Sequence, residues 1–461
     1  MLKRDISFTF AGSALQMLVV LATTALVARL LGPTGQGLLA LAILAPTIAI
    51  TFARLGQETV NVIYGGLYKE KRPALFLQSM LLIVPTSIVS ILVLLAFYFW
   101  LPVERGNFAK LSPTAIYASC LLVPAGLLLA MTTGLVRGLG KVRTNVVLTL
   151  VQCLVNLLLA VLLVAVLKMG LIGAILATIL ATLLGGLAAL WVLREVATFN
   201  PASLDKGFWL RSLRYGLWVA GADFAGFLVY RVDQVMLAFY VPSAQQGLYF
   251  ISASMAERLR MLPTSIASAF LPRLSNQWQE RRGQVPLVFR YSLVASLLAV
   301  ILGCLVGPPA ILVVFGWKYF GSILPFLILA PGIVLMSTSS ILSSAILALG
   351  RPNYNMLTGW LTAVANIALN LILMPRIGIV GAAIASTICY AGDCLCGIIF
   401  YRRLTKIPLA ELAPRLGDVR AVTRIAWEMA RQGLRRLRGP SIGGGGGLAD
   451  NQSDHPAGGP T

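Results

Sequence analysis

Ionisable side chains interrupt several long apolar stretches of this sequence, and their types and spacing could do chemistry. Arginines bind anions through charge-assisted hydrogen bonds, and carboxylates pair with arginines or bind cations. A charge surrounded by hydrocarbon is unfavourable unless a partner or a polar cavity compensates it, so each such residue is a functional hypothesis. The residues concerned are Arg54, Glu58, Asp223, Arg231, Asp233, Glu257, Arg258, Arg260 and Asp393.

Two pairs of these residues have the spacing at which side chains meet on one helix face. Arg54 and Glu58 are four residues apart, and Glu257 and Arg260 are three apart. Either pair could be a neutral structural ion pair instead of a ligand site. Arg231 and Asp233 could equally lie near the outer membrane interface, with their charged ends reaching water. These alternatives stay open at the level of the sequence.

The residues needed for metal-dependent or hydrolytic chemistry are scarce. The single histidine, His455, lies in a polar tail, so neither a histidine-based metal site nor a serine–histidine triad can be built. Cys394 and Cys396 are two positions apart, which places them on different faces of a helix. We interpret the cysteines as small packing residues. The sequence therefore predicts no metal, no cofactor and no enzymatic activity.

The composition indicates that the apolar stretches lie in a membrane. Hydrophobic residues make up 58% of the 461 positions and charged residues 11%, whereas a soluble domain has about 25% charged residues. The mean hydropathy is +0.85. The formal net charge of +21 is concentrated in short loops and in the tail, a pattern typical of membrane topology and not of a nucleic-acid-binding face.

Twelve apolar runs are long enough to be transmembrane helices, each of which needs about 20 residues. The spacing predicts an all-α polytopic membrane protein with about twelve transmembrane helices. The predicted spans are 6–31, 38–66, 74–100, 113–136, 144–167, 171–193, 214–240, 246–271, 286–315, 322–349, 354–374 and 377–401.

Basic residues mark alternate loops, and this alternation predicts the orientation. Lysines and arginines are frequent before the first span and in every second loop after it, for example at Lys69, Arg137 and Arg211, and sparse in the other loops. By the positive-inside rule the basic set faces the cytoplasm. We therefore expect both termini in the cytoplasm and a multi-pass protein of the bacterial cytoplasmic membrane.

The two halves of the chain repeat each other at an offset of about 210 residues. Because six spans bring the chain back to the same side, the two copies run in the same direction. We expect two parallel six-helix repeats around a central cavity, an architecture that favours alternating access. The matching segments are 32–38 with 241–248, 139–145 with 349–355, Asn156 with Asn366, and 170–174 with 378–382 after a two-residue slip.

These patterns divide the chain into four predicted parts. An N-terminal six-helix lobe covers 1–200 and a C-terminal lobe covers 207–403. Residues 404–438 form a basic cytoplasmic segment, either a solvated topology anchor or an amphipathic segment on anionic lipid. Residues 439–461 are glycine-rich and predicted to be disordered.

Several motifs resemble a known family, the bacterial oligosaccharide (O-antigen-type) flippases of polysaccharide synthesis. This family belongs to the superfamily of multidrug, oligosaccharidyl-lipid and polysaccharide exporters. The resemblance covers about 1–405, includes the arrangement of six plus six helices, and is carried by the segments 29–37, 230–237, 246–249, 256–263 and 270–274.

The resemblance implies transport of an undecaprenyl-pyrophosphate-linked oligosaccharide from the cytoplasmic to the outer leaflet. The anionic head would need cavity arginines, and amides could contact sugar hydroxyls. The candidate substrate-binding residues are Arg54, Arg231, Arg258, Arg260, Asn156 and Asn366, with Tyr230 and Gln234 as further sugar contacts. The candidates for ion coupling, or for pairing with those arginines, are Glu58, Asp223, Asp233, Glu257 and Asp393.

Three other functions remain to be compared with this one. A cation-coupled multidrug extruder of the same superfamily should have an acid-rich, arginine-poor cavity. A flippase for the lipid-linked peptidoglycan precursor would share the anionic carrier lipid. A membrane glycosyltransferase or polymerase would need a sizeable loop outside the membrane, and the loops here are short. The expected partners are the lipid-linked substrate, the bilayer and polysaccharide polymerase or assembly proteins, with no nucleic acid.

Overall fold

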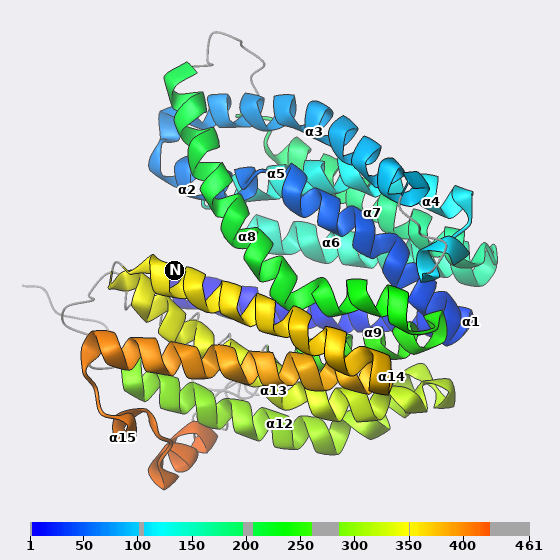
Figure 1. Ribbon diagram of the computed structural model, residues 1–461. Coiled ribbons are helices and arrows are strands. Elements are labelled where there is room, and N and C mark those ends of the chain that lie inside the picture. Colours follow the sequence, from blue (N-terminus) through cyan, green and yellow to red (C-terminus); the bar gives the residue numbers. More distant parts are fainter. Residues whose placement is uncertain (1, 101–105, 197–205, 261–284, 350, 425–461) are drawn as a thin grey trace, which may run out of the picture. The chain divides into compact units, whose positions relative to one another are not determined.

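The computed structural model describes residues 2–100, 106–196, 206–260, 285–349 and 351–424, and these residues are almost entirely helical. The chain divides into two compact units, Met1–Pro414 and Arg415–Thr461. The first unit contains all the long helices (Figure 1). The end of the predicted span 246–271, the last part of the predicted basic segment 404–438 and the predicted disordered tail lie outside the described residues.

The first half of the large unit begins with a long helical element that covers the first predicted span and the start of the second. In α1 (Leu2–Ala53) the backbone leaves helical geometry at Gly32, where φ is 68°, a conformation that glycine adopts without steric penalty. Pro33 then starts the second helical stretch, as a proline in the first turn of a helix does. The other elements are α2 (Gln57–Leu67), α3 (Arg72–Trp100), α4 (Pro113–Cys120), α5 (Leu122–Gly138), α6 (Val142–Ala160) with its π-helical extension (Val161–Val166), and α7 (Gly170–Val192).

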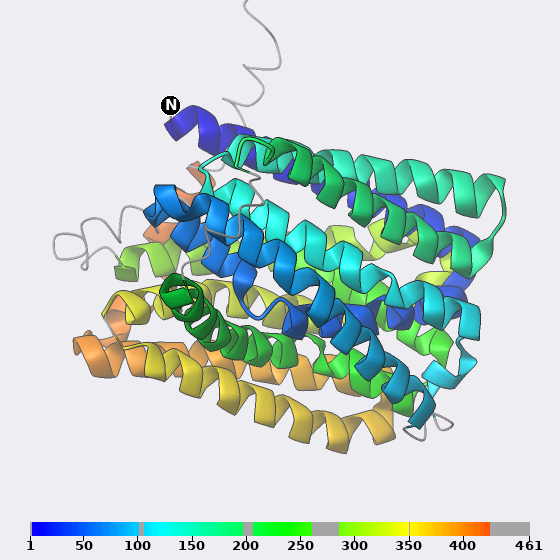
Figure 2. The ribbon, with the colours of Figure 1, turned by 90° about the horizontal axis from the view of Figure 1, so that it is seen from above.

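The second half repeats this order. It contains α8 (Lys206–Tyr240), α9 (Ser243–Arg258), α12 (Val285–Phe315), α13 (Ile323–Ala348) and α14 (Pro352–Thr405), followed by the short α15 (Leu409–Leu412). The helix α14 contains two predicted spans, which are separated at Ile377 and Gly378. In both Figure 1 and Figure 2 the long helices run side by side, and α13 packs against both α12 and α14.

The predicted membrane architecture is confirmed in the described residues. Eight helical stretches are long and apolar enough to cross a membrane. One of them, Asn353–Thr405, contains two predicted spans, and Ala11–Ala53 covers most of the first predicted span and the start of the second. Large apolar side chains such as Leu92 and Leu305 are exposed on the helices, as expected where the solvent is lipid. Splitting α1 and α14 at their breaks, and joining the short α2, α4 and η4 to their neighbours, gives the twelve predicted spans.

Backbone geometry shows that the two halves are copies. Gly170 and Gly378, which match in the sequence repeat, have φ values of 58° and 57°. The glycines three residues later, Gly173 and Gly381, lie against the carbonyls of Leu163 and Leu373, which are themselves 210 residues apart. The same turn is therefore built twice, with the two-residue slip absorbed within it.

The two halves meet at a pair of matched glycines. A Cβ atom on Gly37 of α1 would overlap the carbonyl oxygen of Ser243, and one on Gly247 of α9 would overlap the carbonyl oxygen of Pro33. Each glycine thus faces the carbonyl that lies four residues before the other glycine. This reciprocal contact is what a pseudo-two-fold relation between the halves predicts, and it requires two residues without side chains.

Replacing Gly37 with alanine is expected to destabilise the protein by about 1–3 kcal/mol, since the backbone of α9 must move to admit a methyl group. Gly226→Ala in α8 is the matched control, because no atom of the described residues lies within 4 Å of its Cβ position. In a helix interior alanine should leave stability unchanged or raise it. Thermal unfolding of the two purified variants tests this, and equal melting temperatures would contradict the close crossing.

Candidate functional site

A cavity of about 280 Å³, with a mostly apolar wall that includes several polar side chains, lies between the two halves of the large unit. The first half contributes both stretches of α1 together with α6 and α7, and the second half contributes α8 and α9. The polar side chains that line the cavity are Thr23, Thr24, Gln36, Thr47, Asn156, Thr178, Arg231 and Gln234; Phe250 and the side chains of Val27, Leu39, Ala40, Ile43, Leu44, Ala160 and Ala174 complete its wall.

Among the described residues, Arg231 is the arginine that lines this cavity. The Nη1 atom of Arg231 on α8 lies 3.1 Å from a carboxylate oxygen of Glu257 on α9, and both side chains are about one-third exposed. The ion pair neutralises the arginine inside the membrane segment while leaving part of the guanidinium accessible. Of the predicted substrate-binding residues, Arg231 and Asn156 thus lie in the same cavity, together with Gln234.

Arg54 lies in a second charged group, which connects the two halves. Its guanidinium is 2.8 Å from Glu58, the partner that the four-residue spacing predicts, and 2.9 Å from Asp223 on α8. Arg137, at the end of α5, binds the other oxygen of Glu58. In the sequence Arg137 belongs to the basic loop residues, and its carboxylate partner is 79 residues away in the chain. We call Arg54, Glu58, Arg137 and Asp223 the four-charge network.

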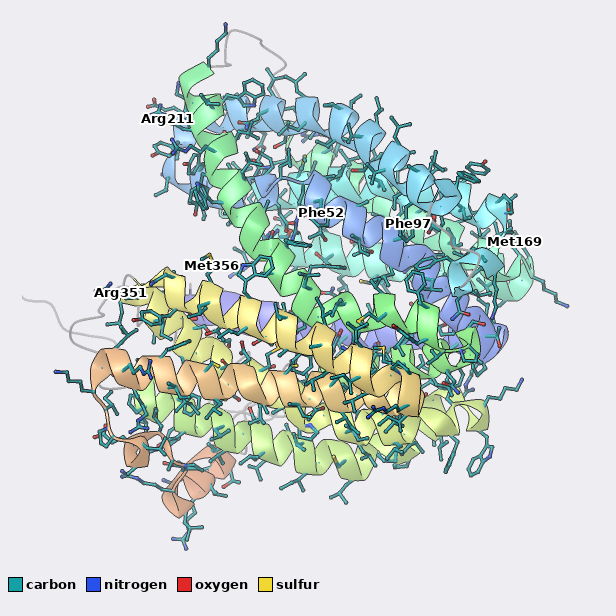
Figure 3. The ribbon with its side chains drawn as sticks, viewed as in Figure 1. Phe52, Phe97, Met169, Arg211, Arg351 and Met356 are labelled. Atoms are coloured by element: carbon teal, nitrogen blue, oxygen red, sulfur yellow. The ribbon has the colours of Figure 1, made fainter. Side chains whose placement is uncertain are left out.

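Backbone geometry explains why Arg54 reaches α8. Helix α1 ends at Ala53, and Leu55 and Gly56 have positive φ values of 48° and 69° before α2 begins. A Cβ on Gly56 would overlap the carbonyl oxygen of Gly216 in α8, so the broken turn lies directly on that helix. Next to it, Phe52 (labelled in Figure 3) and Phe224 have ring centroids 4.9 Å apart.

Hydrogen bonds between buried polar side chains connect the start of α8 to the first half. Ser212 donates a hydrogen bond to Gln78 on α3 at 2.8 Å, and Gln78 donates to Gln57 at 3.3 Å. Gln57 in turn donates to Asn61, whose amide reaches Ser79. These side chains are nearly inaccessible to solvent, and their polar groups satisfy one another.

The opposite end of the interface, near the α1 break at Gly32, has its own contacts between the halves. Arg29 donates hydrogen bonds to the carbonyls of Val313 and Val314 at the end of α12. Asn107 donates to the carbonyl of Val241 at 2.7 Å, and Tyr319 donates to the carbonyl of Ala28 at 2.8 Å. We call these the Gly32-side contacts.

Asp233 does not lie with the arginines of the cavity. It is 3% exposed, and its carboxylate accepts hydrogen bonds from Tyr249, from Ser386 at 3.3 Å and from the backbone of Gln234 at 2.7 Å. Although only two residues apart, Arg231 and Asp233 therefore have different surroundings. The alternative position of Asp233 near an outer, wet interface does not fit this burial.

The remaining candidates do not line the cavity. Arg258 donates to Ser254 one turn earlier, at 2.7 and 2.9 Å, and the guanidinium of Arg260 lies 4.9 Å from the centre of the Tyr230 ring. Asp393 is partly buried on α14.

Asn366 is fully buried and accepts a hydrogen bond from Asn370. The matched asparagines Asn156 and Asn366 therefore have different environments.

Comparisons with known proteins agree with this fold. The family described as polysaccharide biosynthesis protein matches residues 2–278. A probable low-salt glycan biosynthesis flippase of Haloferax volcanii is 27% identical over 208 residues, which are 44% of this chain and 43% of the relative. The chain matches less than half the length of the curated relatives.

Solved transporters of one superfamily have the same fold. The lipid II flippase MurJ in an inward closed conformation gives a TM-score of 0.71 at 13% identity and covers 92% of both chains. An inward-facing multidrug resistance transporter of the MATE family gives 0.66 at 17% identity, covering 85% of this chain and 95% of the other. The family expected from the sequence motifs is confirmed: the chain belongs to the polysaccharide biosynthesis protein family and has the twelve-helix fold of the MATE and MurJ transporters.

Proposed function

We propose that this protein moves an undecaprenyl-pyrophosphate-linked oligosaccharide across the cytoplasmic membrane by alternating access during polysaccharide synthesis. The observation that carries the proposal is the cavity between the halves, in which one arginine faces threonines and amides. Membership of the family and the name of the Haloferax volcanii relative support the same class of substrate.

The chemistry of the cavity suits a diphosphate attached to a sugar. A diphosphate that leaves water needs cationic hydrogen-bond donors, and a guanidinium presents several in a fixed plane. Arg231 supplies them, with Glu257 as its counter-ion in the absence of substrate. In our proposal the substrate phosphates take over part of the contact that Glu257 makes.

A multidrug extruder for organic cations is the alternative from another substrate class. Such a cavity should contain carboxylates, and among the residues that line the cavity the ionisable side chain is an arginine. This favours an anionic ligand. A flippase for the peptidoglycan precursor would bind the same diphosphate carrier, so the cavity chemistry suits it equally. Transport experiments with the two glycans distinguish these functions.

The five carboxylates that are candidates for ion coupling differ in their partners. Glu58, Asp223 and Glu257 are each paired with an arginine, so they serve first as counter-ions. Asp233 is held by Tyr249 and Ser386, which are neutral donors, and we propose it as the better coupling site. Asp393 remains a candidate. In this proposal the protein is a transporter and not an enzyme.

We also propose both termini in the cytoplasm, with the basic residues of alternate loops as the reason. The four-charge network would then lie on the cytoplasmic side of the cavity, and the Gly32-side contacts on the outer side. Polysaccharide polymerase or assembly proteins are the proposed protein partners, since they would use the glycan once it has crossed.

Deletion of the gene should leave lipid-linked repeat units on the inner leaflet and remove surface polysaccharide, because the precursor no longer crosses. Extraction of the lipid fraction and a surface glycan stain measure the two effects. Normal surface polysaccharide together with greater sensitivity to cationic drugs would replace this proposal with the extruder.

Arg231→Gln is expected to lower transport by about tenfold or more, since a charge-assisted hydrogen bond contributes about 1.5–3 kcal/mol. The single variant also leaves Glu257 unpaired, so Arg231→Gln with Glu257→Gln is the matched control for folding. The double variant should regain membrane abundance but not transport. Full transport by the double variant would exclude Arg231 from substrate binding.

Alternating access requires the Gly32-side contacts to open. A cysteine pair at Arg29 and Val313, joined by a short bismaleimide, should therefore block transport, because it ties the two halves together. The matched control is a pair at Lys141 and Glu195, an exposed salt bridge of 3.1 Å within the first half. Both pairs are placed in a variant that lacks the native cysteines. Unchanged transport with the Arg29–Val313 pair fully cross-linked would contradict alternating access at this interface.

A further inference from the structure

The hydroxyl groups of the threonines that line the cavity already donate hydrogen bonds to backbone carbonyls. Thr23 donates to the carbonyl of Val19 at 2.9 Å and Thr24 to that of Val20 at 2.7 Å. A hydroxyl group has one proton to donate and two lone pairs with which to accept. Each hydroxyl therefore presents only acceptor capacity to the cavity.

The other two cavity threonines have the same arrangement. Thr47 donates to the carbonyl of Ile43 at 2.7 Å, and Thr178 donates to the carbonyl of Ala174 at 3.0 Å. All four threonines on this wall lie on α1 and α7, in the first half of the chain. The first half thus contributes hydroxyl acceptors to the cavity, whereas the guanidinium of Arg231 is purely a donor.

Gln36 adds a buried acceptor to this wall. Its residue is 2% exposed, it lines the cavity, and its Oε1 atom is buried without a hydrogen-bond partner among the described residues. A buried polar atom without a partner is unfavourable and calls for an explanation. A donor group on a ligand in the cavity would supply the missing partner.

The repeat provides an internal comparison for Gln36. Its counterpart in the second half is Gln246, which precedes Gly247 as Gln36 precedes Gly37. The Gln246 amide donates to the carbonyl of Gln234 at 3.3 Å, and its Oε1 accepts from Asn107 at 3.1 Å. Both ends of the Gln246 amide are therefore satisfied, whereas the acceptor of Gln36 has no partner among the described residues.

We propose that Gln36 and the threonines Thr23, Thr24, Thr47 and Thr178 form a subsite that binds hydroxyl or amide donors of the sugar next to the lipid diphosphate. This proposal rests on the proposed function, and it predicts the orientation of the substrate within the cavity. The anionic head lies against Arg231 on α8, and the first sugar lies against the wall of the first half. At about 280 Å³ the cavity is near the lower end of small-molecule pockets (about 300 Å³), so it encloses a small part of an oligosaccharide.

The test compares two lipids on the same protein. The full-length protein in lipid nanodiscs is titrated with undecaprenyl diphosphate and, separately, with undecaprenyl diphosphate that carries one N-acetylglucosamine, and binding is measured by native mass spectrometry. Gln36→Met keeps the size of the side chain but removes its hydrogen-bonding groups. We expect it to weaken binding of the sugar-bearing lipid by about tenfold (about 1.4 kcal/mol) and to leave the sugar-free lipid unchanged.

Two further variants separate recognition from folding. Thr47→Val removes one hydroxyl from the same wall and should cause a smaller loss with the same selectivity, so it carries the test if Gln36→Met does not reach the membrane. Gln246→Met removes satisfied hydrogen bonds at a residue that does not itself line the cavity. It should lower the melting temperature without discriminating between the two lipids.

The outcomes distinguish the subsite from the function. Equal losses for the two lipids in Gln36→Met, or no loss for either, would overturn the subsite while leaving the flippase proposal in place. Failure of the wild-type protein to bind either lipid would overturn the proposed function and the subsite with it. A selective loss for the sugar-bearing lipid supports the subsite.

Discussion

The structure depends on one constraint, namely that a charge within a membrane segment needs a partner. Arg54 meets this requirement with Glu58 and Asp223, and Arg231 meets it with Glu257. Because these partners come from different helices, the ion pairs also decide which helices lie together. Of the two arginines, Arg231 lines the cavity, so its ion pair with Glu257 is the one that the proposed anionic substrate would rearrange.

The fold was largely predictable from the sequence, since it follows from periodic and long-range patterns of hydrophobicity. Twelve apolar runs, the repeat at about 210 residues and the Gly32–Pro33 break were all visible in the chain, and Gly170 and Gly378 confirm the repeat in their backbone angles. The sequence did not predict where each helix ends or which predicted spans join into one helical element, because these features depend on local turns such as the one at Leu55 and Gly56.

The site was less predictable, because spacing along one helix reveals only neighbours on that helix. Spacing predicted the ion pair of Arg54 and Glu58. It did not indicate that Arg137 also binds Glu58, or that Glu257 pairs with Arg231 on the adjacent helix. The repeat misled in one respect, since Asn156 lines the cavity and its counterpart Asn366 is buried against Asn370. Duplicated residues keep their place in the fold while their surroundings diverge, and Gln36 and Gln246 diverge in the same way.

The central claim is that the cavity between the halves carries a lipid-linked sugar diphosphate from one leaflet to the other. The most direct measurement is leaflet exchange in proteoliposomes, using a fluorescent polyprenyl-diphosphate saccharide and a membrane-impermeant quencher. We expect the purified protein to make nearly all of the labelled lipid accessible to the quencher, whereas protein-free vesicles expose only the outer half. If half of the labelled lipid stays protected in vesicles that each contain correctly folded protein, the central claim is wrong.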